Sequence, residues 1–397
     1  MSNDIEWKMV RLSSVSSKSA TKGTTPTSIG YDFEKTGINF IKIESITDNG
    51  LFEKNKFAYI SEVCNDMLRR SQLQENDILF SIAGALGRVA IVKKDILPAN
   101  TNQALSIIRL NKKLVDVSFI SFILNSSFIG SQIKENKKGN AQQNLSLTQI
   151  DNLLIPIPYK NGTPDLETQK QIAQKLDDMD SLIAAKEKLL AKKRNLKVAA
   201  MQKLIKDEEG ENWKKVKIGD YLRVKTGSKN TEDKIDDGKY PLYVRSPIVE
   251  RINEYTHDCE AVLTAGDGVG TGKVFHYVNG KFAAHQRVYV ISNFTEIDGK
   301  YFYYQFSQNF YDEVMKYTAK SSVDSVRRGM ITGMEIALPF NSDGSPDLNE
   351  QRRIASILSD MDSEISAIEK EITKLQDLKT AMMQKMFCFE DSDSSSE

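Results

Sequence analysis

Two segments, residues 164–206 and 346–389, carry apolar side chains at alternating spacings of three and four residues. In the second segment these positions are Ile354, Leu358, Met361, Ile365, Ile368, Ile372 and Leu375. In the first they are Ile172, Leu176, Met179, Ile183 and, after an interruption at Lys186, Leu190. Such spacing places the apolar side chains on one stripe of a helix, as in a coiled coil. We predict one long helix in each segment, with Pro164 and Pro346 marking the starts.

The apolar stripe of each predicted helix needs a covering surface. At 1.5 Å per residue each helix would be roughly 60 Å long, too long to bury its stripe alone. The simplest partner is the other helix, in a two-helix coiled coil, and the alternative is that each helix packs on its own domain. A second apolar line in the first helix comprises Leu182, Leu189 and Leu196. The stripe of the second helix is expected to shift, after Leu375, to Leu378, Met382 and Met386.

The two helical segments are copies of each other. Residues 164–205 align with residues 346–387 without gaps, and 22 of the 42 positions are identical. The sequence before each copy is weakly similar, with Trp7 opening the first region and Trp213 the second. The chain therefore repeats a domain followed by a helix, and the domains diverged while the helices did not. Because residue 205 leads almost directly into Trp213, we expect an antiparallel helix pair with pseudo-twofold, circular organisation.

The regions between the helices have a different pattern. Short runs rich in β-branched residues, bounded by Gly, Asn or Asp, predict mainly β cores, and one helix is expected in each region, near 117–136 and 299–317. The fold class is therefore α+β. The predicted divisions are domain 1 (1–163), a central helix (164–206), domain 2 (207–345), a C-terminal helix (346–389) and an acidic, disordered tail (390–397).

Composition and charge narrow the class of protein. The 54 basic and 54 acidic residues balance, but residues 1–163 hold 20 basic and 15 acidic residues, so the N-terminal region favours a polyanion. A chain without overall basicity is expected to share a DNA-binding surface with partners. No apolar run has the length of a membrane span, the first thirty residues lack a signal-peptide pattern, and the three cysteines are far apart. We therefore expect a cytoplasmic protein.

Searches for catalytic motifs give no match. The glycine-rich run Gly266–Lys273 lacks P-loop and dinucleotide-binding spacing and predicts a tight β-turn. There is no NPPY motif for holding a target amine, and Asp236–Lys239 is best interpreted as a solvated turn. His257, His276 and His285 lack metal-ligand spacing, so no metal site is expected. These observations argue against an enzyme. An enzyme with an unrecognised catalytic site stays open as an alternative.

The remaining polar residues of the predicted loops suit DNA recognition. Arg, Asn and Gln side chains make the paired hydrogen bonds that distinguish base edges, and Lys and Thr in loops can hold phosphates. An ordinary surface role is the alternative for each residue, and the prediction rests on their duplicated arrangement. The candidates are Lys18, Lys22, Thr24, Arg88, Asn102 and Gln103 in domain 1, and Lys229, Asn230, Lys273, His285, Gln286 and Arg287 in domain 2.

The arrangement resembles the specificity (S) subunit of type I restriction-modification systems. The resemblance covers essentially the whole chain, and its most specific part is a helical motif present twice. In the first copy Ile155-Pro156-Ile157-Pro158 precedes Pro164-Asp165-Leu166-x-x-Gln169-x-x-Ile172-Ala173 and Asp178-Met179-Asp180. In the second, Leu338-Pro339 precedes Pro346-Asp347-Leu348-x-x-Gln351-x-x-Ile354-Ala355 and Asp360-Met361-Asp362. Gly23-Thr24-Thr25-Pro26 also matches the family, whereas domain 2 has Thr226-Gly227 without a following Pro.

This resemblance implies a non-catalytic protein with two target-recognition domains, each reading one half of a bipartite, asymmetric sequence in double-stranded DNA. The helix pair would set the length of the unread spacer. Two modification subunits, carrying S-adenosylmethionine, would methylate adenine N6, and two restriction subunits, using ATP and Mg²⁺, would translocate and cleave DNA. The chain itself would bind no cofactor. The alternative is a coiled-coil scaffold whose domains bind proteins, which does not explain why the domains diverged.

Overall fold

The computed structural model describes residues 5–137, 144–205, 212–317 and 325–387. The predicted acidic tail (390–397) lies outside these ranges. The chain forms two compact units: unit 1 comprises residues 1–186 and 372–397, and unit 2 comprises residues 187–371. Each unit therefore contains one domain together with part of both long helices, whereas the predicted divisions assigned each helix to a segment of its own.

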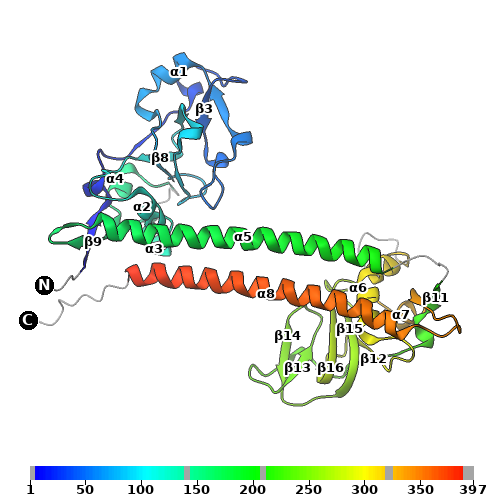
Figure 1. Cartoon of the computed structure of the whole chain (residues 1–397). Coiled ribbons are helices and arrows are strands. Elements are labelled where there is room, and N and C mark those ends of the chain that lie inside the picture. The colour runs from blue at the N-terminus through cyan, green and yellow to red at the C-terminus, as the bar shows by residue number, and fades with distance from the viewer. Residues whose placement is uncertain (1–4, 138–143, 206–211, 318–324, 388–397) are drawn as a thin grey trace, which may run out of the picture. The chain divides into compact units, whose positions relative to one another are not determined.

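Unit 1 combines small sheets with short helices (Figure 1). One sheet has the order β1-β9-β10, with β1 (Glu6–Arg11), β9 (Leu154–Lys160) and β10 (Thr163–Pro164). An antiparallel sheet has the order β2-β8-β5-β6, with β2 (Thr21–Lys22), β8 (Leu105–Ile108), β5 (Ile78–Ser81) and β6 (Val89–Ile91). The third has the order β4-β3-β7, with β4 (Ala58–Ile60), β3 (Ile38–Ile41) and β7 (Ala99–Thr101). The short α-helices are α1 (Glu62–Met67), α2 (Val117–Leu124), α3 (Ser127–Lys137) and α4 (Leu147–Asp151).

Unit 2 repeats this plan with longer strands. A two-stranded sheet joins β11 (Trp213–Lys217) to β18 (Glu335–Pro339), as β1 joins β9 in unit 1. The main sheet has the order β12-β17-β15-β16-β13-β14. Its strands are β12 (Arg223–Thr226), β17 (Val288–Ser292), β15 (His257–Ala265), β16 (Phe275–Ala284), β13 (Tyr240–Tyr243) and β14 (Val249–Ile252). Helices α6 (Gly299–Met315) and α7 (Arg328–Thr332) complete the domain. These elements confirm the predicted α+β class.

The helix predicted near 299–317 is present as α6, but the prediction of one helix near 117–136 is wrong. Two helices, α2 and α3, stand there instead. The interruption occurs at Asn125 and Ser126. Asn125 ends α2, and the Ser126 hydroxyl accepts a hydrogen bond from the Ile129 backbone N–H (3.4 Å), which caps the next helix.

The two long helices are α5 (Leu166–Leu204) and α8 (Leu348–Phe387). Each begins two residues after the expected proline, because an aspartate caps it. Asp165 Oδ1 accepts hydrogen bonds from the N–H groups of Glu167 and Thr168, and Asp347 Oδ1 accepts from those of Asn349 and Glu350. A carboxylate at this position satisfies N–H groups that the helix itself cannot bond.

The predicted stripe is the covered face of both helices. Its α8 residues Ile354, Leu358, Ile368 and Ile372 are buried, and Met361, Ile365 and Leu375 are half-buried. In α5, Leu176 is buried, whereas Ile172, Met179, Ile183 and Leu190 are half-buried. The second apolar line is not covered, because Leu182, Leu189 and Leu196 are 45%, 39% and 46% exposed.

The predicted shift of the α8 stripe is wrong at Leu378, whereas Met382 is half-buried as predicted and the side chain of Met386 lies outside the described residues. Leu378 is 52% exposed, and the original spacing instead continues through Lys379 to Met382. Lys379 fits this position because its ammonium group meets Asp180 at 2.5 Å and lies 5.3 Å from the centre of the Phe122 ring. A lysine can therefore occupy the stripe by burying its aliphatic stem while its charge remains paired.

The same arrangement occurs in unit 2, where Lys197 meets Asp362 at 2.5 Å and lies 5.5 Å from the centre of the Tyr304 ring. These residues correspond to those around Lys379 under the repeat, with the roles of α5 and α8 exchanged. Lys193 also meets Glu364 at 2.5 Å. Increasing residue numbers on α5 therefore meet decreasing numbers on α8, so the helix segments within this unit are antiparallel, as predicted.

Both alternatives for covering the stripe are partly correct. The first turns of α5 contribute Ala173 and Leu176 to the core of domain 1, and those of α8 contribute Ile354 and Leu358 to the core of domain 2. Ion pairs between α5 and α8 show that the two helices also meet each other within each unit. Their last turns again pack on the domain cores, through Met382 and Met383 in domain 1 and through Met201 and Leu204 in domain 2.

A buried glutamine fastens each domain to the long helix that follows it. Gln169 is fully buried, accepts a hydrogen bond from the Asp116 N–H (2.9 Å) and donates one to the Leu114 carbonyl (3.2 Å). Gln351 repeats this with the Asp298 N–H (2.9 Å) and the Glu296 carbonyl (3.3 Å). The repeated Gln of the helical motif therefore joins two elements of the fold.

Candidate nucleic-acid interface

In domain 1 a glycine loop lies against the turn between β7 and β8. The Gly23 N–H donates to the Asn102 carbonyl (3.1 Å), and a Cβ atom at Gly23 would stand 1.7 Å from the Thr101 carbonyl oxygen. Only glycine permits this approach. The Thr25 hydroxyl donates to Gln103 Oε1 (2.6 Å), so the loop that contains the candidates Lys22 and Thr24 is bonded to the turn that contains Gln103.

Domain 2 contains the same loop and turn with different side chains. A Cβ atom at Gly227 would stand 2.1 Å from the Ala284 carbonyl oxygen, and the Gln286 N–H donates to the Lys229 carbonyl (2.8 Å). Gln286 Nε2 donates to Asn230 Oδ1 (2.8 Å). Gln103 and Gln286 are both exposed and both held from the loop side. Their remaining donors and acceptors therefore face solvent in a fixed orientation.

The domain 2 site adds a charged cavity of about 330 Å³. Its lining residues are Asn230, Thr231, Glu232, Arg245, Asp267, His285, Gln286 and Arg287. The Asp267 carboxylate holds two guanidinium groups, Arg245 Nη1 at 2.8 Å and Arg287 Nη1 at 3.0 Å. The Arg287 side chain remains 64% exposed, so it is oriented from one side and available to a ligand from the other.

His285 is a structural part of this site. It is 6% exposed, and its Nδ1 accepts a hydrogen bond from the Arg287 backbone N–H (2.9 Å). Burial, and then the positive charge of Arg245, lower the pKa of His285 below its usual value of 6.5. A neutral ring with an accepting Nδ1 fixes the turn that presents Gln286 and Arg287.

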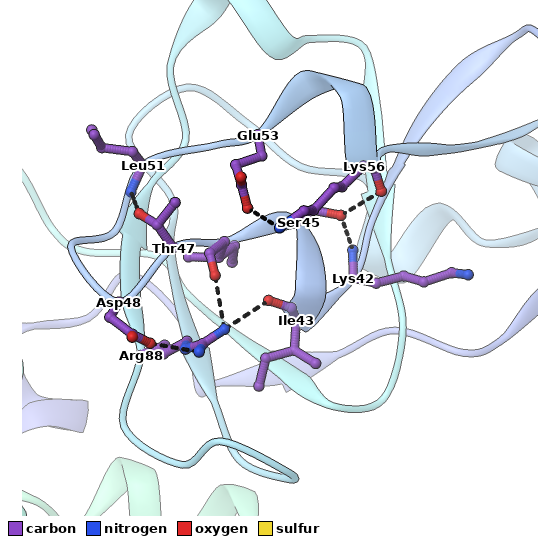
Figure 2. Close-up of polar contacts among 10 residues, drawn as sticks. Lys42, Ile43, Ser45, Thr47, Asp48, Leu51, Glu53, Lys56 and Arg88 are labelled. Carbon is purple, nitrogen blue, oxygen red and sulfur yellow. Dashed lines mark hydrogen bonds and ion pairs between the residues drawn. The ribbon is translucent and has the colours of Figure 1, made fainter. Parts of the chain in front are cut away.

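Arg88, predicted as a base-reading residue, instead holds a loop of its own domain (Figure 2). Its Nη1 donates to the Ile46 carbonyl (2.9 Å), and its Nη2 lies 2.5 Å from the Asp48 carboxylate. The same loop is closed by Ser45, whose hydroxyl donates to the Lys56 carbonyl (3.0 Å). A DNA contact from this guanidinium would require breaking bonds that fold residues 43–53, so the geometry does not favour the predicted role.

The other candidates lie elsewhere in their domains. Asn102 Oδ1 accepts from the Ala104 N–H (3.0 Å), which leaves the amide nitrogen for other bonds. Lys273 lies in the connection between β15 and β16, 5.5 Å from the centre of the Tyr311 ring. This connection contains the expected turns but extends over residues 266–274. Lys18 is exposed, Lys22 and Thr24 are half-buried beside Gly23, and Lys229 pairs with Glu254.

Three residues of the sites were not predicted. Thr25 stands within the noted Gly-Thr-Thr-Pro segment, and its hydroxyl was a detectable signal. Arg245 and Asp267 have no local motif, because they meet only when the β13–β14 loop reaches the end of β15.

Among the residues that the structure describes, no group of acidic, His and Cys side chains could hold a metal ion. None of the helices described is long and apolar enough to cross a membrane.

Comparison with known protein families gives a match over most of the chain. The model of the type I restriction modification DNA specificity domain matches residues 4–192 and again residues 210–377. The chain belongs to this family. Each match covers one domain and most of the long helix after it, so the two units of the repeat are two specificity domains.

Individual relatives agree with the family assignment. The specificity subunit of the type I restriction enzyme EcoBI from Escherichia coli is 28% identical over 186 residues, which are 45% of this chain and 37% of the relative. A match to the EcoDI subunit also covers 37% of that relative. The chain thus aligns with little more than a third of these two. The MjaX specificity subunit of Methanocaldococcus jannaschii, a putative one, is 25% identical over 88% of this chain and 86% of its own length.

Solved structures share the fold of this specificity protein. The S subunit of a type I restriction-modification system from M. genitalium has a TM-score of 0.66 at 16% identity, covering 98% of each chain. A chain from a study of complex assembly and conformational transition of the type I system has a TM-score of 0.57 at 17% identity, covering 98% of this chain and 99% of the other.

Proposed function

We propose that this chain is the DNA-reading subunit of a type I restriction-modification complex, with each domain reading one half of a bipartite, asymmetric target. The observation that carries the proposal is the duplicated loop-and-turn site. Both domains build it with a glycine that permits close approach, and both present a glutamine from it. The neighbouring side chains differ, as two readers of different sequences require.

The chemistry of the two sites suits base edges in the major groove. A glutamine amide can pair with adenine N6 and N7, and an arginine guanidinium with guanine O6 and N7. Gln103 in domain 1 is held by Thr25, whereas Gln286 in domain 2 stands next to Arg287. Such contacts discriminate only when the side chain is pre-oriented, and the bonds from Thr25, Asn230 and Asp267 provide that orientation.

Catalysis and energy supply are assigned to partners in this proposal. Two modification subunits bind S-adenosylmethionine and methylate adenine N6, and two restriction subunits use ATP and Mg²⁺, all in the cytoplasm. On α5, Leu189 and Leu196 are seven residues apart and 39% and 46% exposed, which offers an apolar ridge for a modification subunit. The helix pair sets the spacer between half-sites.

The test is the pattern of adenine methylation that the chain directs. The chain and its modification subunit are expressed in a host without adenine methylation, and the genome is sequenced for modified adenines. We expect one gapped motif that is absent when the gene for this chain is deleted. If the chain were only a protein scaffold, the motif would be the same with and without it, or no motif would appear.

A further inference from the structure

Two pairs of adjacent arginines stand beside the candidate reading sites and take no part in the network just described. They are Arg69–Arg70 in domain 1 and Arg327–Arg328 in domain 2. We propose that each pair binds the phosphates of the DNA backbone next to the half-site that its domain reads. This inference rests on the proposed function, because it names further contacts made at the same sites.

In domain 1 the arginine pair is fixed to the strands that lead into the reading loop and turn. Arg70 Nη2 donates to the carbonyl of Lys22, the residue before Gly23 (3.3 Å). The Asn100 amide donates to Asn65 Oδ1 (2.9 Å) and to the Leu68 carbonyl (3.2 Å), which ties α1 to β7. Since β7 leads into Gln103, the arginines and the reading residues share one rigid support.

In domain 2 a different element anchors arginines next to the charged cavity. The N–H of Val326, the residue before Arg327, donates to the Gly266 carbonyl (2.7 Å), and the Tyr289 hydroxyl donates to the Val326 carbonyl (3.0 Å). Gly266 precedes Asp267, whose carboxylate holds Arg287. The Arg327–Arg328 pair is thereby anchored next to the charged cavity.

The four arginines differ from the other arginines at these sites in lacking a carboxylate partner. All four are exposed, and in the described parts of the chain none forms an ion pair, although Asp66 on α1 is three residues from Arg69. By contrast, Arg88, Arg245 and Arg287 each pair with an aspartate. Arg69 Nε donates only to the Asp66 carbonyl (3.1 Å), so most of its guanidinium donors remain available. Guanidinium groups with unused paired donors match phosphate geometry.

The repeat does not account for this arrangement. Arg69 and Arg70 follow α1, which lies between β4 and β5, whereas Arg327 and Arg328 stand between α6 and β18. The two pairs therefore occupy non-corresponding positions of the duplicated plan, and each is anchored to a strand end at the loop-and-turn site of its own domain. Placement next to DNA explains why each domain has such an arginine pair, whereas the shared origin of the domains does not.

The experiment measures how DNA binding depends on salt. The full chain, assembled with its modification subunit, is titrated against a fluorescein-labelled duplex of mixed sequence at several KCl concentrations. Each phosphate contact contributes about 0.9 to the slope of log Kd against log salt. The R69Q/R70Q and R327Q/R328Q variants are each expected to lower the slope by roughly 1.8, since two contacts are lost. The methylated motif should remain unchanged.

Two further variants make the result specific. R69K/R70K keeps both charges and should retain most of the slope, which separates loss of charge from a folding defect. R352Q/R353Q removes another adjacent pair, in which Arg353 meets Glu350 at 2.6 Å and Arg352 lies 3.8 Å from Asp298, and it should leave the slope unchanged.

An unchanged slope in the glutamine variants would overturn the inference, and so would an altered methylation motif, because the arginines would then read bases. Either result leaves the proposed function standing. If the wild-type chain directs no motif, the proposed function fails, and the slopes on mixed-sequence DNA still decide whether the arginines bind phosphate.

Discussion

At the scale of single residues, Asp267 is the group on which the proposed reading site of domain 2 depends. It holds Arg245 and Arg287 by separate oxygens, so one carboxylate orients two guanidinium groups. The three residues come from distant parts of the chain, and their meeting depends on the register of the sheet.

We predict that Asp267→Asn weakens recognition of one half of the target. The amide cannot pair with both guanidinium groups, and a well-oriented base contact contributes about 1–3 kcal/mol of discrimination. The methylation rate at the full motif should fall about tenfold, and substitutions in the second half-site should matter less than in the wild type. Asp258→Asn, which changes an exposed acid of β15, is the matched control and should have no effect. An equal loss at both half-sites would contradict the assignment.

The three histidines predict a pH dependence of stability that is stronger in domain 2 than in domain 1. Burial lowers the pKa values of His257, His276 and His285 below 6.5. The folded state therefore binds fewer protons than the unfolded state as the pH falls below about 6.5, and stability decreases until the folded-state pKa values are reached. Domain 1 has no histidine.

The two tryptophans allow this prediction to be measured. Trp213 packs in the core of domain 2, and Trp7 packs against that of domain 1. In a Trp7→Phe variant, the urea midpoint reported by Trp213 should fall between pH 7.5 and 5.5. In a Trp213→Phe variant, the midpoint reported by Trp7 should fall less. Equal falls in the two urea midpoints would contradict the assignment of the pH dependence to the histidines.

Residue types could be chosen from the sequence, but their roles could not. Gln103, Gln286 and Arg287 were selected because they stand in duplicated turns, and the structure brings them to the loops that hold Thr24 and Asn230. Arg88 stands in an equally suggestive turn, yet its charge is used by Asp48 and backbone carbonyls. The sequence around Arg88 does not reveal that its side chain is already bonded, because the loop that binds it lies 42 positions away in the chain.

At the scale of elements, the repeated motif has a mechanical explanation. Gln169 and Gln351 are both fully buried, and each bonds the N–H of the aspartate that caps a domain helix, α2 or α6. The glutamine thus joins three things: the long helix, the capped helix and the turn before it. Heptad spacing in the sequence predicted both long helices. It did not show that each apolar stripe continues through Lys197 or Lys379, because a lysine does not count as an apolar residue.

We predict that Gln351→Leu lowers the free energy of unfolding by about 1–3 kcal/mol, because the Asp298 N–H and the Glu296 carbonyl lose their partner inside the protein. Chemical denaturation would measure the change. Gln171→Leu alters an exposed glutamine of α5 and should stay within about 0.5 kcal/mol of the wild type. Similar losses for the two variants would argue against a special role for the buried amide.

At the scale of the whole molecule, the repeat separates what is kept from what varies. The long helices share 22 of 42 positions, whereas the domains share little beyond the plan of their strands and the glycine loop. A common scaffold with two exchangeable readers explains this division. In the proposed function the helices set the distance between half-sites.

If the helix pair sets the spacer, adding one heptad to both α5 and α8 should lengthen it. Seven residues add about 10.5 Å to a helix, which corresponds to roughly three base pairs. Sequencing of methylated adenines would report the preferred spacer, and binding that is lost altogether would also agree with a fixed spacing. An unchanged spacer in an active complex would contradict this role.

The central claim, that the two domains read DNA independently, is tested most directly by exchanging one of them. Residues 213–340 are replaced by the corresponding domain of another family member, and methylated adenines are mapped across the genome. We predict a motif whose first half and spacer are retained and whose second half is new. A motif altered in both halves, or in neither, would contradict the account.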